Sequence, residues 1–413
     1  MAPAAGPGVA PLPVADARLQ DATTELEEAR SSGEPDRLTV ALARYARALE
    51  SVGHPKDAIS VLEGGLPAPG CGERAGALFF AARAWVRYRL QQYEGATEDA
   101  LEALAAFEVG GTVQPEVADC HNTIASVARS LLRPDEAAMH YQRGLEAAMA
   151  AGALDQELRL LCNFALLEIE RGHLGVGLDL ARRALGAAEL AQEDYFCAVA
   201  RLRLGLAYFY LGRLEEAEEQ LSAAATLSKQ LGATLPRIDS LQYLAWVRAE
   251  LGRFDQALAN GTEAVALAQQ TPSFLGMASM VLAEVHLLAD QPEQARALVA
   301  PIVATAHSHH PPERYMAQCI GVLGRAELAL GNSEEGLTRL AEAVSDPAFS
   351  IHDWENVRLL RITGECEGAL GHSARGLERL ERARSALLQM GATRELRKAE
   401  AAIAALRDAP PKR

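Results

Sequence analysis

Apolar residues recur along this chain at the spacing of an α-helix, and short polar turns interrupt them at regular intervals. In the middle of the chain, Leu202, Leu206 and Phe209 are followed by Leu214 and Leu221, so one side of each segment is apolar. Aromatic residues make up only 5% of the chain and alanine is abundant, a mixture that favours closely packed helices over strands. The pattern predicts an all-helical protein with essentially no β-structure.

One seven-residue phrase recurs nine times and marks the turns between helices. The nine phrases are VGHPKDA (52–58), LQQYEGA (90–96), LLRPDEA (131–137), RGHLGVG (171–177), LGRLEEA (211–217), LGRFDQA (251–257), ADQPEQA (289–295), LGNSEEG (330–336) and LGHSARG (370–376). Successive phrases begin 38 to 41 residues apart, which indicates a repeat architecture. In each phrase we expect one helix to end near the glycine position and the next to begin at the Pro, Asp or Ser that follows.

Two positions of the repeat are small in all nine units. The first lies seven residues before the second residue of each phrase and is occupied by Ala46, Ala84, Ala125, Ala165, Gly205, Ala245, Ala283, Gly324 and Gly364. The second is the last residue of each phrase, namely Ala58, Ala96, Ala137, Gly177, Ala217, Ala257, Ala295, Gly336 and Gly376. Because only Ala or Gly lets two antiparallel helices approach closely where they cross, we expect these positions at the crossing points. A single helical hairpin cannot bury both of its faces, so neighbouring hairpins must stack into a solenoid.

The phrase LGRLEEA, with Leu204, Gly205, Tyr208 and Ala217 around it, resembles the tetratricopeptide repeat, and the other eight units match it less completely. The resemblance covers roughly residues 36–390 and implies a right-handed α-solenoid of about nine antiparallel helix pairs. The long units are similar to the C-terminal repeat arrays of large ATP-driven bacterial transcription regulators, and residues 383–400 are similar in style to the ends of those arrays. The resemblance therefore implies a bacterial protein with an interaction or regulatory role.

The segments outside the repeats are expected to cap or flank the array. We expect a disordered leader over residues 1–14 and a capping helix over 15–35. The nine hairpins then occupy residues 36–392, a second capping helix follows over 393–409, and residues 410–413 form a disordered tail. Such half-polar end helices shield the last apolar face of a solenoid from water.

The chain carries 40 Lys and Arg against 55 Asp and Glu, a net charge of −15. A surface this acidic repels phosphate, so we expect no nucleic-acid partner. The end of the chain differs, because residues 357–413 carry twelve Lys and Arg against seven Asp and Glu. Two interpretations of this basic end stay open: a solvated final helix pair with ion pairs such as Glu378 with Arg382, or a docking patch for an acidic partner.

Six cysteines are scattered through the chain without any CxxC pair: Cys71, Cys120, Cys162, Cys197, Cys319 and Cys366. This spacing is typical of small buried hydrophobic residues in a reducing compartment rather than of disulfides or a metal site. The N-terminal residues lack the basic and apolar regions of a signal peptide, and no stretch approaches about eighteen apolar residues in a row. The sequence thus predicts a cytoplasmic protein with no membrane partner.

Catalytic signatures are absent from the sequence, which contains no GxxxxGK[ST] phosphate loop and no HExxH, GxSxG or EF-hand pattern. The glycines of residues 64–72 lack the lysine that a phosphate cradle needs. His307, His309 and His310 form a ligand-like cluster, but a structural zinc site also needs a fourth ligand, so a solvated loop is the favoured interpretation. We expect no enzymatic activity, no cofactor and no metal.

The strongest functional signal is a stripe on the first helices of successive pairs, which line the concave surface in tetratricopeptide arrays. The resemblance places eight residues there: Trp85, Tyr88, Arg129, Leu166, Ile169, Leu206, Phe209 and Trp246. Charged residues occupy the matching positions toward both ends: Arg47, Glu50, Glu284, Arg325 and Glu365. An apolar centre with charged rims is typical of a groove for an amphipathic helix or an apolar peptide. The alternative is that the extended helices bury these residues as ordinary solenoid core.

Some family members also clamp a C-terminal carboxylate with a set of basic and amide residues. Asn163 and Arg203 fall at two of the positions of that set, whereas Asn122, Ser126 and Val199 depart from it. The resemblance therefore implies no carboxylate clamp in this chain.

Two functional hypotheses follow from the groove. The leading one is a non-catalytic adaptor or scaffold that binds a peptide or helical segment of a protein partner. The alternative is a regulatory sensor that changes its superhelical pitch on binding a peptide or small ligand and acts on a separate effector in transcription or signalling. The groove hypothesis predicts that Trp85, Phe209 and Trp246 are substantially exposed. The sequence leaves the oligomeric state open.

Overall fold

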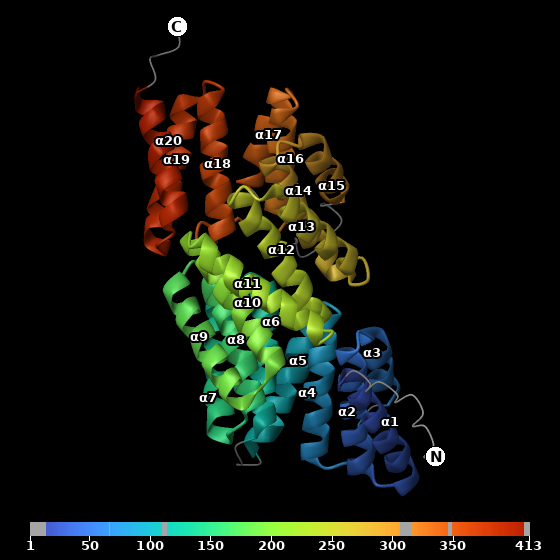
Figure 1. The fold of residues 1–413 in the computed structure, drawn as a ribbon. Helices are drawn as coiled ribbons and strands as arrows, with labels where there is room; N and C mark the ends of the chain where they lie inside the picture. The colour runs from blue at the N-terminus through green and yellow to red at the C-terminus, as the bar shows by residue number, and fades with distance from the viewer. Residues whose placement is uncertain (1–13, 66, 110–113, 306–314, 346–348, 409–413) are drawn as a thin grey trace, which may run out of the picture. The chain divides into compact units, whose positions relative to one another are not determined.

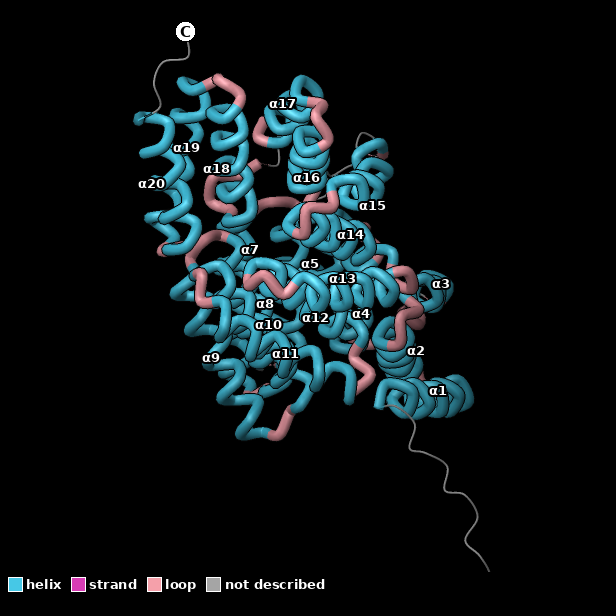
Figure 2. Tube along the Cα trace, turned by 45° about the horizontal axis from the view of Figure 1, so that its top comes forward, coloured by secondary structure: helices cyan, strands magenta, loops and turns pink. Residues whose placement is uncertain are grey.

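The computed structural model describes residues 14–65, 67–109, 114–305, 315–345 and 349–408. Over these ranges the chain is all-helical, with twenty helices and no strand (Figures 1 and 2). The helices are α1 (Val14–Ser32), α2 (Pro35–Ser51), α3 (Pro55–Gly64), α4 (Glu73–Arg89), α5 (Tyr93–Val109), α6 (Pro115–Ser130), α7 (Pro134–Ala151), α8 (Leu154–Glu170), α9 (Leu174–Ala191), α10 (Asp194–Leu211), α11 (Leu214–Gln230), α12 (Thr234–Glu250), α13 (Phe254–Ala268), α14 (Pro272–Leu288), α15 (Pro292–Ala304), α16 (Met316–Ala329), α17 (Ser333–Ala343), α18 (Trp354–Ala369), α19 (Ser373–Met390) and α20 (Thr393–Asp408). The predicted fold class is confirmed. Residues 1–13 of the predicted leader and the whole predicted tail, 410–413, lie outside the described residues, as does residue 409 of the predicted second capping helix.

The nine phrases form the turns of the helix pairs, and each contains the same backbone conformation. The second residue of every phrase has a positive φ, between 57° at Leu132 and 92° at Gly371. In the turn after α10, the N–H of Gly212 donates to the carbonyl of Phe209 and that of Arg213 donates to the carbonyl of Tyr208, at 2.9 and 2.8 Å. This is the Schellman arrangement, in which a left-handed residue ends a helix. Glycine is frequent at this position because it adopts positive φ without strain.

The two small positions lie where the helices of a pair cross, as expected. All eighteen residues of these two positions are buried. A Cβ atom built on Gly324 would lie 2.9 Å from the carbonyl oxygen of Gly336, and one built on Gly364 would lie 2.9 Å from that of Gly376. The backbones therefore touch at the crossing, and no larger side chain fits there.

The chain divides into two compact units, which are described separately: unit 1 (Met1–Leu160) and unit 2 (Leu161–Arg413), with the boundary inside α8. In unit 1 the first helices of successive pairs, α2, α4 and α6, contact one another in that order. In unit 2 the first helices α10, α12, α14, α16 and α18 do the same, and α20 contacts α18. Each unit therefore presents a face built only from first helices, and these faces carry the predicted site residues.

Candidate functional site

The face of unit 1 presents an aromatic pair. Trp85 and Tyr88, both on α4, are half-buried, and their ring centroids lie 5.3 Å apart. The Trp85 Nε1–H donates a hydrogen bond of 2.9 Å to Glu50 Oε2 on α2. This bond fixes the orientation of the indole, so part of a large aromatic surface stays in water in one defined position.

Charged side chains surround this aromatic pair. The Arg47 guanidinium lies over the Trp85 ring, 5.7 Å from its centroid, and 3.8 Å from Asp119 Oδ2 on α6. Arg89 Nε lies 2.9 Å from Glu50 Oε1, and Arg159 Nη1 lies 3.1 Å from Asp119 Oδ1. The seven residues that form this connected set are called the Trp85 surface: Arg47, Glu50, Trp85, Tyr88, Arg89, Asp119 and Arg159. Arg129, the other predicted site residue in unit 1, is half-buried on α6.

The face of unit 2 is closed, which corrects the expected exposure of Phe209 and Trp246. Both residues are buried, with 4% and 2% of their surfaces exposed. Leu206 and Ile169 are buried as well, and Leu166 is half-buried. The alternative that these residues belong to the core is therefore correct for the buried four. Trp85 also falls short of the predicted exposure, because it is half-buried.

The residue that covers this face is Trp354, at the start of α18. Its ring stacks on Tyr210 with the centroids 4.1 Å apart and the planes 6° from parallel. The same indole lies 5.6 Å from the Phe209 ring, and Phe209 lies 5.3 Å from Trp246. The Tyr210 hydroxyl donates a hydrogen bond of 2.5 Å to Glu355 Oε1. A compact aromatic cluster thus joins α10 and α12 to α18.

Buried ion pairs also join α18 to α12 and α14, and α16 to α14. Arg358 on α18 pairs with Glu284 on α14 and lies 3.7 Å from Glu250 on α12, while Arg325 on α16 also pairs with Glu284. Burial acts to raise the pKa of Glu284, but the charges of Arg325 and Arg358 outweigh it and hold the pKa well below its usual value. The Arg358 guanidinium also lies over the Trp246 ring, 5.0 Å from its centroid.

Side chains of the last helix, α20, also contact this region. Arg394 Nη1 lies 2.6 Å from Glu250 Oε2, and Lys398 Nζ lies 3.4 Å from the same oxygen. The Thr393 hydroxyl donates to the carbonyl of Leu211 at 3.1 Å. We call the full set the closure, and its members are Phe209, Tyr210, Trp246, Glu250, Glu284, Trp354, Arg358 and Arg394.

The cavity beside the closure is small. It has a volume of about 20 Å³ and is lined by Trp246, Met280, Glu284, Arg325 and Arg358, among others, which is room for one water molecule. Trp246 Nε1 and Arg358 Nε are buried without a hydrogen-bond partner among the described residues. A peptide therefore fits on this face only if the closure opens.

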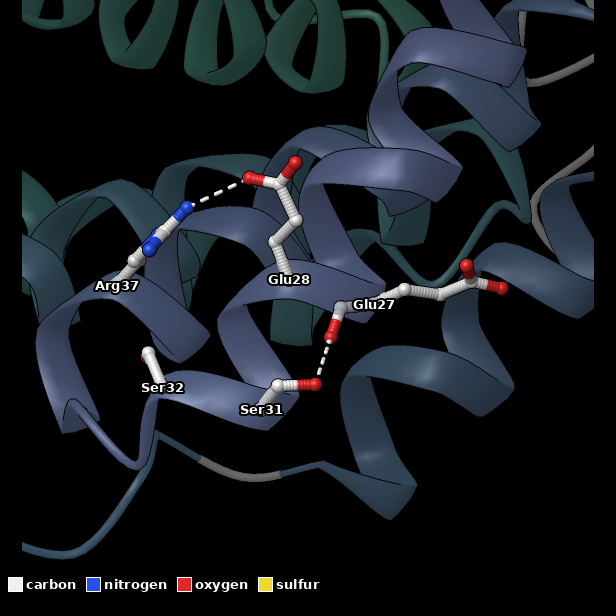
Figure 3. Close-up of a pocket in the computed structure, with 5 residues that line it drawn as sticks. All are labelled: Glu27, Glu28, Ser31, Ser32 and Arg37. Carbon is white, nitrogen blue, oxygen red and sulfur yellow. Dashed lines mark hydrogen bonds and ion pairs between the residues drawn. The ribbon is translucent and has the colours of Figure 1, made fainter.

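A second depression, of about 530 Å³, lies between α1 and the start of α2 (Figure 3). Its polar groups bond to one another: Arg37 pairs with Glu28 at 2.8 Å, and the Ser31 hydroxyl donates to the carbonyl of Glu27 at 3.0 Å. The Glu27 carboxylate, which also lines the depression, points away from Arg37 in Figure 3, so the charged groups here do not converge on one point.

Metal ligands do not gather in the part of the chain that the structure describes, where no group of three or more His, Cys, Asp or Glu side chains could hold an ion. The histidines of residues 307–310 lie outside the described residues. Among the helices described, none has the length and apolar character needed to cross a membrane.

Residues 196–270 match the tetratricopeptide repeat family, which confirms that resemblance for this part of the chain. A comparison with curated protein sequences finds no match. Among solved structures, the apo form of the quorum sensor NprR from B. thuringiensis is 14% identical, with a TM-score of 0.60 over 80% of this chain and 97% of that chain. NprR in complex with its cognate peptide NprX is also 14% identical, with a TM-score of 0.58 over 80% and 98% of the two chains.

A Rap protein complexed with competence and sporulation factor is similar over 93% of this chain and 100% of that chain, with 14% identity and a TM-score of 0.55. At these identities the likeness shows the fold, and the fold is a tetratricopeptide-like helical repeat.

The sequence missed the closure, whose contacts with α18 join residues between 74 positions apart, as in Glu284 and Arg358, and 145 positions apart, as in Phe209 and Trp354. A signal was present in α18, where Arg358 and Arg361 flank Leu359 and Leu360 within the apolar stretch that runs from Val357 to Ile362. Cations in such a position indicate buried ion pairs, although they do not identify the partners.

Proposed function

We propose that the protein is a non-catalytic, cytoplasmic binding protein that holds a peptide or helical segment of a protein partner on the Trp85 surface of unit 1. The observation that carries the proposal is the half-buried aromatic pair Trp85 and Tyr88, whose orientation the Glu50 hydrogen bond fixes. Trp, Tyr and Arg are the residue types that contribute most binding energy at protein interfaces. All three types occur together on this surface.

Two of the similar solved structures support a peptide as the ligand class. One is NprR in complex with its cognate peptide, and the other is a Rap protein complexed with competence and sporulation factor. Their fold is that of this chain, and first-helix faces of such arrays are suited to hold an extended or helical segment. Of the predicted site residues, Trp85 and Tyr88 remain in the proposal, whereas the closure covers Phe209 and Trp246 in the described state.

A photo-crosslinking experiment tests the proposal. A crosslinking phenylalanine analogue placed at Tyr88 in the full chain should capture a protein segment from the native cell extract, which mass spectrometry then identifies. The matched control carries the analogue at Phe254, which is exposed on α13 in unit 2. Capture of the same segments at both positions, or at neither, would contradict the proposal.

The closure favours a second candidate function, a peptide-sensing regulator. Buried ion pairs add little net stability compared with apolar residues of similar size, so a face held shut by Arg358, Glu250 and Glu284 is not the most stable way to build a core. A charged ligand can instead replace one partner in each of these ion pairs with a group of its own. In this account a bound peptide opens unit 2 and thereby changes the surface that an effector protein meets.

Pulsed electron paramagnetic resonance on the full chain tests this candidate. Spin labels at Glu215→Cys on α11 and Arg382→Cys on α19, both exposed, report the separation of the two sides of unit 2. The partly exposed Cys71 and Cys366 are replaced by Ser to keep the labelling specific. Addition of the captured segment should lengthen the label distance. A bound segment that leaves the distance unchanged would rule out the sensor and leave the binding proposal intact.

A further inference from the structure

The Trp85 surface carries more cationic hydrogen-bond donors than its own carboxylates can satisfy. Three arginines, Arg47, Arg89 and Arg159, share the two carboxylates Glu50 and Asp119. Each guanidinium has five N–H donors. Arg47 makes no hydrogen bond to any described residue, because its nearest carboxylate oxygen is 3.8 Å away, too far for one.

The cations also lie nearer to solvent than the anions. The side chains of Arg47, Arg89 and Arg159 are 30%, 28% and 31% exposed, whereas those of Glu50 and Asp119 are 12% and 18% exposed. The three arginine side chains therefore present more of their surface to solvent than the two carboxylates do. A partner that approaches this surface meets these positive groups, with the Arg47 guanidinium over the Trp85 ring and the Tyr88 ring beside it.

This local charge is opposite to that of the unit that carries it. Unit 1 contains 14 Lys and Arg against 23 Asp and Glu, a net charge of −9. A partly exposed cationic patch on an acidic body attracts anionic groups to one place, whereas the rest of the surface repels them.

We propose that the Trp85 surface selects an acidic peptide segment, in which Asp or Glu side chains bind Arg47 and Arg159 while an apolar side chain between them packs on Trp85 and Tyr88. Guanidinium groups suit this role because they bind carboxylates with paired, directional hydrogen bonds. This inference rests on the proposed function and names the ligand class of the same surface.

Fluorescence anisotropy with three synthetic octapeptides tests the preference. The peptides alternate Leu with Glu, Gln or Lys and carry fluorescein at one end. Net charge alone favours the Lys peptide on a chain of −15, whereas the proposal predicts that the Glu peptide binds at least about tenfold more tightly than the Gln peptide. That preference should shrink as salt rises, because the groups involved are partly exposed.

Two charge-reversed proteins provide the matched comparison. The double variant Arg47→Glu with Arg159→Glu should lose the tenfold preference for the Glu peptide. Arg133→Glu, a reversal on an exposed arginine at the turn before α7, should keep it. Thermal melts of both variants check that folding is intact.

Equal binding of the Glu and Gln peptides, or no binding of the Glu peptide up to about 1 mM, would overturn the acidic preference. The acidic preference would also be overturned if a short single-stranded DNA bound the wild type as tightly as the Glu peptide does and did not bind the double variant. A partner segment that crosslinks at Tyr88 but binds the double variant with unchanged affinity would overturn only this inference and leave the proposed function standing.

Discussion

The indole of Trp354 stacks on the phenol ring of Tyr210 with the ring planes 6° from parallel, although the two residues lie 144 positions apart in the chain. This contact brings the first helix of the last pair onto the first helices in the middle of the array. Local repeat packing alone would leave these helices separated by the pairs between them. Unit 2 is therefore a closed body, held by the aromatic cluster inside it and by Arg394 and Lys398 on Glu250 outside it.

Alanine at Gly212 should destabilise the protein more than alanine at Gly371. Both glycines end a helix with positive φ, at 82° and 92°, so both substitutions strain the backbone by about 1–2 kcal/mol. At Gly212 the new Cβ would also lie 2.5 Å from the Cβ of Arg394, whereas nothing lies within 4 Å of one at Gly371. We expect an extra loss of about 1–2 kcal/mol for Gly212→Ala, because the α20 contact must shift. Equal losses in urea unfolding of the two variants would show that α20 does not pack on this turn in solution.

Truncation of Trp246 and of Trp85 should affect folding to different degrees. Trp246 is 2% exposed in the closure, so Trp246→Ala should lower the free energy of unfolding by about 3–5 kcal/mol. Trp85 is half-buried and bonded to Glu50, so Trp85→Ala should cost only about 1–2 kcal/mol. Chemical denaturation of both variants measures the difference. A Trp246→Ala protein as stable as the wild type would mean that unit 2 is open in solution.

The protein should lose stability at acidic pH through Glu395, which lies on α20 and pairs with Arg361 on α18 and with Lys398. Burial acts to raise the pKa of Glu395, but Arg361, Arg358 and Lys398 outweigh it and lower the pKa to about 2. The unfolded value is about 4.3, so this group contributes stability above that pH and loses it as pH falls toward about 2, by on the order of 3 kcal/mol. Glu395→Gln removes the titration, and its free energy of unfolding should fall less than that of the wild type between about pH 5 and pH 2. Parallel pH profiles of the two proteins would contradict this assignment.

Leucine at position 132 should be replaceable by glycine at little or no loss of stability. Leu132 is 40% exposed and has a φ of 57°, a conformation that costs a non-glycine residue about 1–2 kcal/mol. Glycine removes this strain, but it also gives the unfolded chain more conformational freedom. That added freedom lowers the free energy of unfolding by about 0.5–1 kcal/mol. Leu132→Gly should therefore raise the free energy of unfolding by between zero and about 1.5 kcal/mol. A loss of about 2 kcal/mol or more in urea unfolding would indicate a packing role for the Leu132 side chain.

The sequence predicted the parts of the fold that depend on neighbouring residues. One helix crossing requires small residues such as Gly205 and Ala217, and one helix end requires a turn residue such as Gly212. Each requirement lies within a single unit, so the pattern repeats with the unit. The exposure of the face could not be predicted in the same way. It depends on small rotations that add up over successive pairs until Trp354 reaches Tyr210. No single unit contains that information.

The affinity of the crosslinked partner segment for the Trp85→Ala variant tests the central claim most directly. The segment is synthesised, and its dissociation constant is measured by calorimetry with the wild type, with Trp85→Ala and with Phe254→Ala, an exposed aromatic truncated in unit 2. The account predicts that Trp85→Ala weakens binding by about 1–3 kcal/mol, or roughly 5- to 150-fold, whereas Phe254→Ala leaves it unchanged. An unchanged dissociation constant for a folded Trp85→Ala protein would place the binding site elsewhere and contradict the account.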